Sequence, residues 1–212
     1  MKKRSIGKSS GFTLIEILVV IVIISILTGL TVVGVTGAMR SARKNSSEAL
    51  IQALNGALSN YQMRYGDYPP SSLEAFKVQM PNDLNNGVEA MVACLSSTLK
   101  GGKVWEAPSE ELYSNTDGDR ASRNVTSWFF GDLALHEVTD YFQNVLTYMH
   151  HRDYVKPGSR MVKYLLREKE KPQTLVPVRS SKTKTYARPD TFQITSAGID
   201  GNLGTSDDLF SW

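Results

Sequence analysis

The sequence contains very little cysteine. Cys94 is the only one in 212 residues, so no intrachain disulfide can form. Exported domains of this size often use such a crosslink, and this chain must be stabilised in other ways. Cys94 lies in an apolar pattern with helical spacing, which predicts a buried thiol rather than a reactive one.

The motifs of catalysis are also missing. The sequence has no Gly-Xaa-Ser-Xaa-Gly motif, no phosphate-binding loop and no dinucleotide-binding fingerprint. The only histidines, His136, His150 and His151, have no carboxylate or cysteine at a spacing that makes a zinc site compelling. We therefore expect that the chain is not an enzyme.

The N-terminus accounts for the net positive charge of the chain. The net formal charge is +3, but residues 1–11 contain four basic side chains and no acidic one. The rest of the chain has 20 Lys and Arg against 21 Asp and Glu, a net charge of −1. The apparent basicity therefore argues neither for nucleic acid nor for an anionic membrane surface as a partner, and we expect no nucleic acid partner.

A long apolar run follows this basic leader. Glu16 is the only ionisable residue in the 28 residues 12–39. As a helix this run would be about 42 Å long, more than the roughly 30 Å of a hydrocarbon core, so we predict a transmembrane helix at 12–39. A charged, unpaired carboxylate there costs several kcal/mol, so Glu16 needs a cationic partner. An α-amine becomes available if the chain is cut between Gly11 and Phe12.

This arrangement resembles the N-terminal signal of type IV pilins and of the pseudopilins of type II secretion. The resemblance implies that a prepilin peptidase removes the leader 1–11 after Gly11 and that the new N-terminal Phe12 is methylated. It also implies that Glu16 binds the amine of a neighbouring subunit during assembly into a helical filament. The alternative from the residues alone is an ordinary signal anchor, with Glu16 at the level of the lipid headgroups.

The apolar run continues without a proline into an amphipathic segment at 40–66. Gly66 and the following Asp67-Tyr68-Pro69-Pro70 end the helix. We expect one long N-terminal helix, transmembrane and then amphipathic, packed on a small antiparallel sheet in a globular head at 67–212. This fold class is α+β and pilin-like. Six apolar residues at spacings of three and four form the stripe that faces the head: Leu50, Leu54, Ala57, Leu58, Tyr61 and Tyr65.

Within the head we predict two short helices, three strands and one insertion. The helices begin near Ser71 and Asn86, a hairpin at 132–149 turns at 140–144, and a third strand covers 191–196. The insertion, 156–188, has ten basic residues against two acidic ones. It is interpreted as a long exposed loop, which either docks on an acidic neighbouring subunit or is simply solvated.

The C-terminal segment is rich in glycine and aspartate. Taken alone, it is an acidic turn. It resembles the C-terminal loop of the major pseudopilin of type II secretion, which binds calcium in several members. That resemblance implies Ca²⁺ bound by the side chains of Asp200, Asp207 and Asp208 and the carbonyl of Ala197, since calcium takes six to eight oxygens.

A second acidic turn lies at Asn115-Thr116-Asp117-Gly118-Asp119. It is similar to the first half of a helix–loop–helix calcium loop, but the twelfth position is Thr126 instead of an acid. A plain β-turn is favoured, and binding of a second ion by Asp117 and Asp119 stays open.

Together these features predict a pseudopilin, most similar to the major subunit of type II secretion. The expected location is the bacterial inner membrane, as a single-pass protein with its head in the periplasm, and then a periplasmic pseudopilus that promotes protein export. Expected partners are further copies, minor pseudopilins, the inner-membrane assembly platform and prepilin peptidase. The alternatives are a type IV pilin for adhesion, motility or DNA uptake, and a non-polymerising, signal-anchored binding domain.

Overall fold

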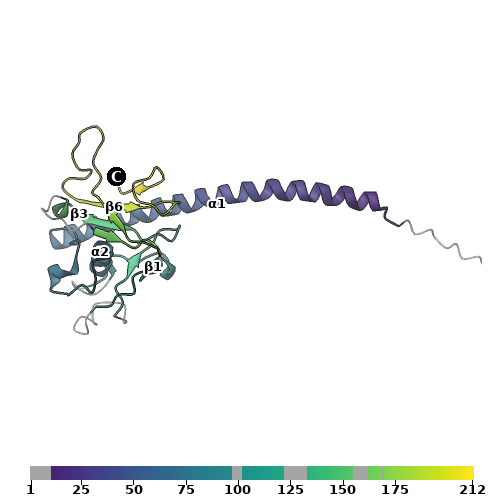
Figure 1. The fold of residues 1–212 in the computed structure, drawn as a ribbon. Helices are drawn as coiled ribbons and strands as arrows, with labels where there is room; N and C mark the ends of the chain where they lie inside the picture. Colours follow the sequence, from purple (N-terminus) through teal and green to yellow (C-terminus); the bar gives the residue numbers. More distant parts are fainter. Residues whose placement is uncertain (1–10, 97–101, 122–132, 155–161, 169) are drawn as a thin grey trace, which may run out of the picture. The chain divides into compact units, whose positions relative to one another are not determined.

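The computed structural model describes residues 11–96, 102–121, 133–154, 162–168 and 170–212. Most of the predicted leader and parts of the predicted insertion lie outside these ranges. The chain divides into two compact units, one up to Ala42 and the other from Arg43 to Trp212. The long helix α1, Leu14–Tyr65, contributes to both (Figure 1).

The end of α1 agrees with the prediction from sequence. Gly66 has a φ of +85°, and its N–H donates to the carbonyl of Gln62 at 2.8 Å. A left-handed residue at this point satisfies one of the helix's last carbonyls and turns the chain away.

The predicted membrane span at 12–39 is not confirmed. Within the described residues, no helix combines the length and the apolar character needed to cross a membrane. The run of aliphatic side chains is interrupted from Thr28-Gly29 onward by threonine and glycine.

The amphipathic stripe of α1 packs into the head as predicted. Leu54 and Leu58 are fully buried, and Tyr61 is 2% exposed. They belong to a core cluster that includes Met91 and Leu95 of α2, Asn86–Ser96, as well as residues of the sheets. This cluster explains how a helix with polar residues on its other face is held to the head.

The central sheet has three antiparallel strands in the order β3-β6-β7. These are β3 Thr147–His150, β6 Phe192–Ser196 and β7 Leu209–Phe210, and β3 and β6 lie beside the C-terminal half of α1 in Figure 1. The predicted third strand at 191–196 is therefore confirmed. The observed α+β arrangement of a long helix and small antiparallel sheets is consistent with a pilin-like fold.

The predicted hairpin at 132–149 is only partly correct. The turn at 140–144 forms, because the N–H groups of Phe142 and Asn144 donate to the Asp140 carboxylate at 2.8 and 2.9 Å. However, β2, Glu137–Val138, pairs with β1, Tyr113–Ser114, instead of with β3. The two arms of the turn are linked by an isolated bridge from Thr139 to Val145 instead of by a strand ladder.

The predicted exposed loop at 156–188 is partly wrong. Its described residues include β4, Val162–Tyr164, paired with β5, Gln173–Leu175. Tyr164 and Leu166 are buried in the core, and Leu175 is 9% exposed. Alternating apolar side chains therefore fold part of this basic segment onto the head despite its charge.

Three short 3-10 helices complete the described elements. The first agrees with the predicted short helix, with Ser72 rather than Ser71 as its N-cap: the Ser72 hydroxyl accepts from the N–H of Glu74 at 3.2 Å. The three are η1 Leu73–Phe76, η2 Glu110–Leu112 and η4 His151–Asp153.

Candidate functional site

The predicted cleavage point lies in exposed, non-helical backbone. Gly11 and Phe12 precede the first residue of α1, and Phe12 is 79% exposed. A Cβ built on Gly11 would have no atom within 4 Å. A peptidase can therefore reach this peptide bond without unwinding the helix.

Glu16 closes the first turn of α1 through a capping box with Thr13. The N–H and the hydroxyl of Thr13 each donate to Glu16 Oε2 at 2.7 Å, and the N–H of Glu16 donates to Thr13 Oγ1 at 3.3 Å. These bonds satisfy backbone donors that a helix N-terminus otherwise leaves free. Thr13 was missed in the sequence, although its three-residue spacing to Glu16 is the signature of such a cap.

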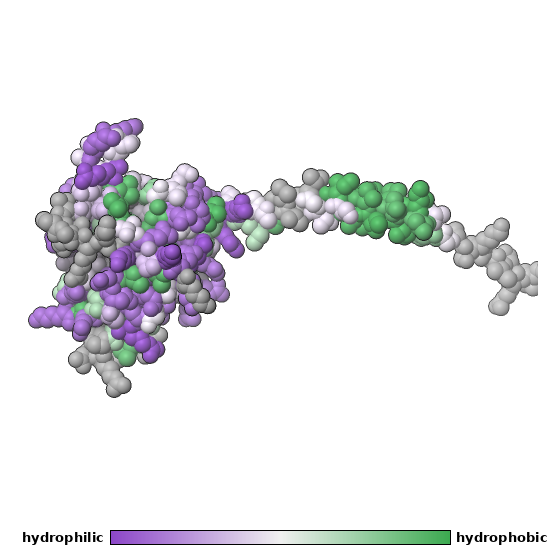
Figure 2. Space-filling model, in the orientation of Figure 1, coloured by the Kyte–Doolittle hydropathy of each residue, from purple (hydrophilic) through white to green (hydrophobic). Residues whose placement is uncertain are grey.

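The helix that follows carries large apolar side chains around its whole circumference. Leu14 and Ile15 are 85% and 69% exposed, and the next aliphatic residues are about half exposed. Figure 2 shows this apolar surface on α1 and a mainly hydrophilic surface on the head. A contiguous apolar surface of this kind marks a site that lipid or protein covers. The exposed aliphatic residues between Ile17 and Leu27 are Ile17, Leu18, Val19, Val20, Ile21, Val22, Ile23, Ile24, Ile26 and Leu27.

The C-terminal loop closes through Asp207. Its Oδ2 accepts the N–H groups of Ile199 and Asp200 at 2.6 and 3.1 Å, and its Oδ1 accepts the hydroxyl of Thr205 at 2.8 Å. These hydrogen bonds lower the pKa of Asp207, and the bond from the Thr205 hydroxyl has the largest effect. Gly198, with a φ of +62°, lies against Asp207 so closely that a Cβ would collide with it.

The other predicted calcium ligands also have partners within the loop. Asp208 accepts from the N–H of Gly204 at 2.8 Å, and Asp200 accepts from the N–H of Asn202 at 2.8 Å. Ala197 is buried at the start of the loop. Asp200, Asp207 and Asp208 do not form one of the groups of three converging ligand atoms found among the described residues. The oxygen donors suit calcium chemically, and binding by this loop stays a prediction.

The loop is fastened to the sheet and to the turn at 140–144. Asn144 Nδ2 donates to the carbonyl of Gly198 at 2.6 Å, and the hydroxyl of Ser196 donates to the carboxylate of Asp140. Burial raises the pKa of Asp140. Its hydrogen bonds with Ser196 and Asn144 lower the pKa and offset only part of this rise. The turn and the C-terminal segment are therefore one connected polar structure.

The structure brings two histidines together with a carboxylate, which the sequence did not indicate. One ligand atom each of Asp67, His150 and His151 lies within 4.8 Å of the others. His150 Nε2 is 3.2 Å from Asp67 Oδ1, and Arg152 Nη1 is 2.8 Å from Asp67 Oδ2. The Arg152 ion pair gives Asp67 a counter-charge of its own, so this group needs no metal.

Comparison with known families finds one match, at the N-terminus. Residues 6–32 match the model described as the prokaryotic N-terminal methylation motif. This stretch contains Gly11, Phe12 and Glu16 and is the signal of type IV pilin-like precursors, which prepilin peptidase cuts and which assemble into filaments. No curated protein and no solved structure matches the chain significantly.

Proposed function

We propose that this chain is the precursor of a filament subunit similar to the major pseudopilin of type II secretion. The methylation motif at 6–32 is the observation that carries the proposal. The exposed peptide bond between Gly11 and Phe12 supports it, because the peptidase must reach that bond. The role is structural rather than enzymatic, in keeping with a sequence that has no catalytic motif.

Cleavage changes the chemistry around Glu16. It converts the amide nitrogen of Phe12 into an α-amine, which is a cation when protonated. In the single chain the Glu16 carboxylate is occupied by uncharged donors of Thr13. A neighbour's α-amine is a stronger partner for a carboxylate, since charge-assisted hydrogen bonds are about twice as strong as neutral ones. Assembly would thus exchange a local cap for a contact that fixes the axial stagger of two subunits.

The apolar surface of α1 supplies the driving force for assembly. In the precursor we propose that it keeps the chain at the bacterial inner membrane, with the head in the periplasm. In the pseudopilus the same surface of neighbouring copies would cover it, so that little apolar area meets water in either state. Minor pseudopilins and an inner-membrane assembly platform are the further partners, and export of proteins is the output.

Calcium in the C-terminal loop is part of this proposal. The ligands would be Asp200, Asp207 and Asp208, with the carbonyl of Ala197. The loop's connection to the sheet supports a stabilising role, because an ion there would tighten the contact of Gly198 with Asp207.

Intact-mass analysis of the native protein tests the processing step. We expect a chain that lacks residues 1–11 and carries one added methyl group on Phe12. A chain that keeps its leader would contradict filament assembly and identify a signal-anchored binding domain.

Deletion of the gene in its host separates a pseudopilus from a pilus. A pseudopilin predicts loss of protein export with no change in surface pili. Long surface pili that vanish with the gene, together with normal export, would instead identify a type IV pilin.

Two substitutions of Glu16 separate the effect of its charge from the effect of its capping hydrogen bonds. Glu16→Gln keeps an oxygen that can accept from Thr13, because glutamine also serves in capping boxes, but removes the charge. We expect both Glu16→Gln and Glu16→Ala to reduce filament formation at least tenfold in electron micrographs, with membrane association unchanged. Glu48→Gln, an exposed acid on the same helix, is the matched control. Normal filaments from Glu16→Gln would refute the charge pairing.

A further inference from the structure

Three acidic side chains from distant segments meet inside the head. Glu89 lies in the first turn of α2, Asp117 lies in the turn after β1, and Glu137 lies in β2. One carboxylate oxygen of each lies within 4.8 Å of the others. Glu89 is 1% exposed and Glu137 is fully buried, so water does not screen their charges.

Glu89 points into this cluster without a partner among the residues that the structure describes. Within that part of the chain, neither of its oxygens accepts a hydrogen bond. Among the described residues, no lysine, arginine or histidine forms an ion pair with Glu89, Asp117 or Glu137. A buried carboxylate with no hydrogen bond and no counter-charge is among the costliest arrangements in a folded protein. Something that these contacts do not include must therefore compensate it.

The other two acids are held in place by neutral donors. Glu137 accepts from Asn85 Nδ2 at 2.7 Å and from the N–H of Thr116 at about 3 Å. Asp117 Oδ2 accepts from Asn82 Nδ2 at 2.9 Å. These bonds orient the carboxylates without supplying a positive charge. Oriented, uncompensated oxygens are the donor set that a hard cation requires.

A fourth acid, Asp119, comes from the same turn as Asp117. Both of its oxygens are buried without a hydrogen-bond partner among the described residues, and the residue is 7% exposed. It is outside the group of three converging oxygens, but its N–H donates to Asp117 Oδ1 at 3.4 Å, so it lies next to the cluster. The turn therefore brings two acids to the cluster.

We propose that Glu89, Asp117 and Glu137 bind one calcium ion, with Asp119 beside them. Calcium–oxygen distances are about 2.3–2.6 Å, so two ligands of one ion lie at most about 5 Å apart, which the observed separations satisfy. An all-oxygen set with no imidazole or thiolate favours calcium over zinc. The turn Asn115–Asp119 has alternating oxygen-bearing residues, and Glu89 and Glu137 supply the acids that its local sequence lacks. This site is separate from the C-terminal loop and does not depend on the proposed function.

Protonation is the competing way to remove the repulsion. Burial raises the pKa of Glu137 to about 7 and that of Glu89 well above its ordinary value. A protonated cluster needs no ion and would leave the protein indifferent to calcium. A calcium site predicts that the chain binds calcium and melts at a higher temperature when the ion is added, so the two explanations are distinguishable.

The test measures calcium binding to the full chain, purified in detergent and stripped with EDTA. Isothermal titration with calcium gives the number of bound ions, and thermal melts give the stability with and without the ion. The variants are Glu89→Gln, the double variant Asp207→Asn/Asp208→Asn, and Glu111→Gln, an exposed acid of η2 that serves as the matched control.

We expect Glu89→Gln to bind one calcium fewer than the wild-type chain. In EDTA it should melt higher than the wild type, because a buried unpaired charge has been removed, and calcium should raise its melting temperature less. Glu111→Gln should behave like the wild type. The double variant should retain the ion that Glu89→Gln loses. This result would distinguish calcium bound at the acid cluster from calcium bound in the C-terminal loop.

Equal calcium stoichiometry in the wild type and Glu89→Gln would overturn the proposal. An unchanged melting temperature of Glu89→Gln in EDTA, with no calcium bound at the cluster in either chain, would establish protonation instead. If Glu89→Gln does not fold, as judged by circular dichroism, Asp117→Asn replaces it, because Asp117 is only half-buried. The same stoichiometric loss is then expected.

Discussion

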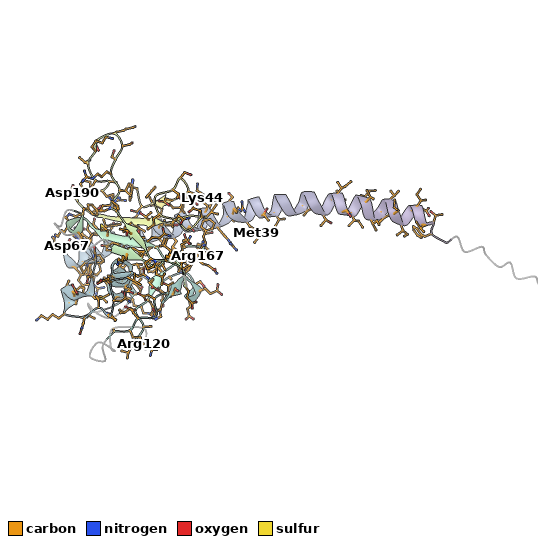
Figure 3. The ribbon with its side chains drawn as sticks, in the orientation of Figure 1. Met39, Lys44, Asp67, Arg120, Arg167 and Asp190 are labelled. Atoms are coloured by element: carbon orange, nitrogen blue, oxygen red, sulfur yellow. The ribbon has the colours of Figure 1, made fainter. Side chains whose placement is uncertain are left out.

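At the scale of single residues, the buried polar side chains of the head have different partners. Glu137 is held by Asn85 and Thr116, whereas Glu89 has no hydrogen-bond donor in the described part of the chain. His150 is 3% exposed and lies between Asp67 and the backbone N–H of Arg152 (Figure 3 labels Asp67). His150 Nδ1 accepts from Arg152, so the ring proton is on Nε2 and donates to Asp67. A neutral His150 therefore satisfies both contacts.

The neutral state of His150 predicts a pH dependence of stability. Burial lowers its pKa from 6.5, and His151 acts in the same direction, while Asp67 and Asp153 oppose the change. The unfolded chain therefore takes up the proton first as the pH falls. The contribution of His150 is complete above pH 6.5 and is lost as the pH falls toward the folded pKa, by at most about 1.4 kcal/mol per pH unit.

Denaturant unfolding between pH 5 and 8 measures this effect. Between pH 5 and 6.5, stability should rise less with pH in His150→Gln than in the wild type. The difference between the two chains isolates His150, since the raised pKa of Glu137 acts in the opposite direction in both. Parallel profiles for the wild type and His150→Gln would show that the histidine does not titrate differently in the two states.

At the scale of elements, local signals were readable from the sequence and long-range contacts were not. The end of α1 at Tyr65 follows from Gly66 and two prolines, all within a few residues. The pairing of β1 with β2 joins two-residue strands far apart in the chain, and so short a strand has no periodicity to detect. The β4–β5 hairpin was hidden by its basic side chains.

The same distinction applies to the candidate sites. The motif around Gly11, Phe12 and Glu16 is contiguous, and the family comparison supports it. The acid cluster gathers residues of α2, the turn after β1, and β2, so only the fold brings them together. From the sequence, Asp117 and Asp119 could be singled out, but their distant partners could not.

The contact of α2 with β3 predicts a strong effect at Gly87. A Cβ there would collide with the carbonyl oxygen of Tyr148 and lie 2.6 Å from the Tyr164 hydroxyl. That hydroxyl donates to the same carbonyl and accepts from the N–H of Tyr148, both at 2.9 Å. Gly87→Ala should therefore destabilise the head by about 1–3 kcal/mol, because neither side can move without breaking these bonds.

Thermal and denaturant unfolding of the Gly87→Ala variant tests this contact. The matched control is Gly56→Ala in α1, where a Cβ meets nothing within 4 Å. An exposed helical glycine replaced by alanine should gain up to about 1 kcal/mol. Equal effects of the two substitutions would mean that Gly87 does not lie against Tyr148 as described.

At the scale of the whole molecule, the two units differ in how many of their apolar side chains each buries by itself. The unit from Arg43 to Trp212 contains the core cluster, from Leu50 of α1 to Leu209 of β7. In the first unit, the described apolar side chains between Leu14 and Leu27 are exposed. The first unit therefore depends on a surrounding partner, and the second has a core of its own.

This difference predicts the behaviour of a chain that begins at Arg43. We expect it to fold, to melt cooperatively and to stay monomeric without detergent, because the core residues of α1 lie beyond that point. The processed full chain should associate, since its apolar helix needs cover. Light scattering after size exclusion gives the masses, and circular dichroism gives the melts. A truncated head that still assembles would move the main subunit contact from α1 to the head surface, and one that fails to fold would show that residues before Arg43 stabilise the core.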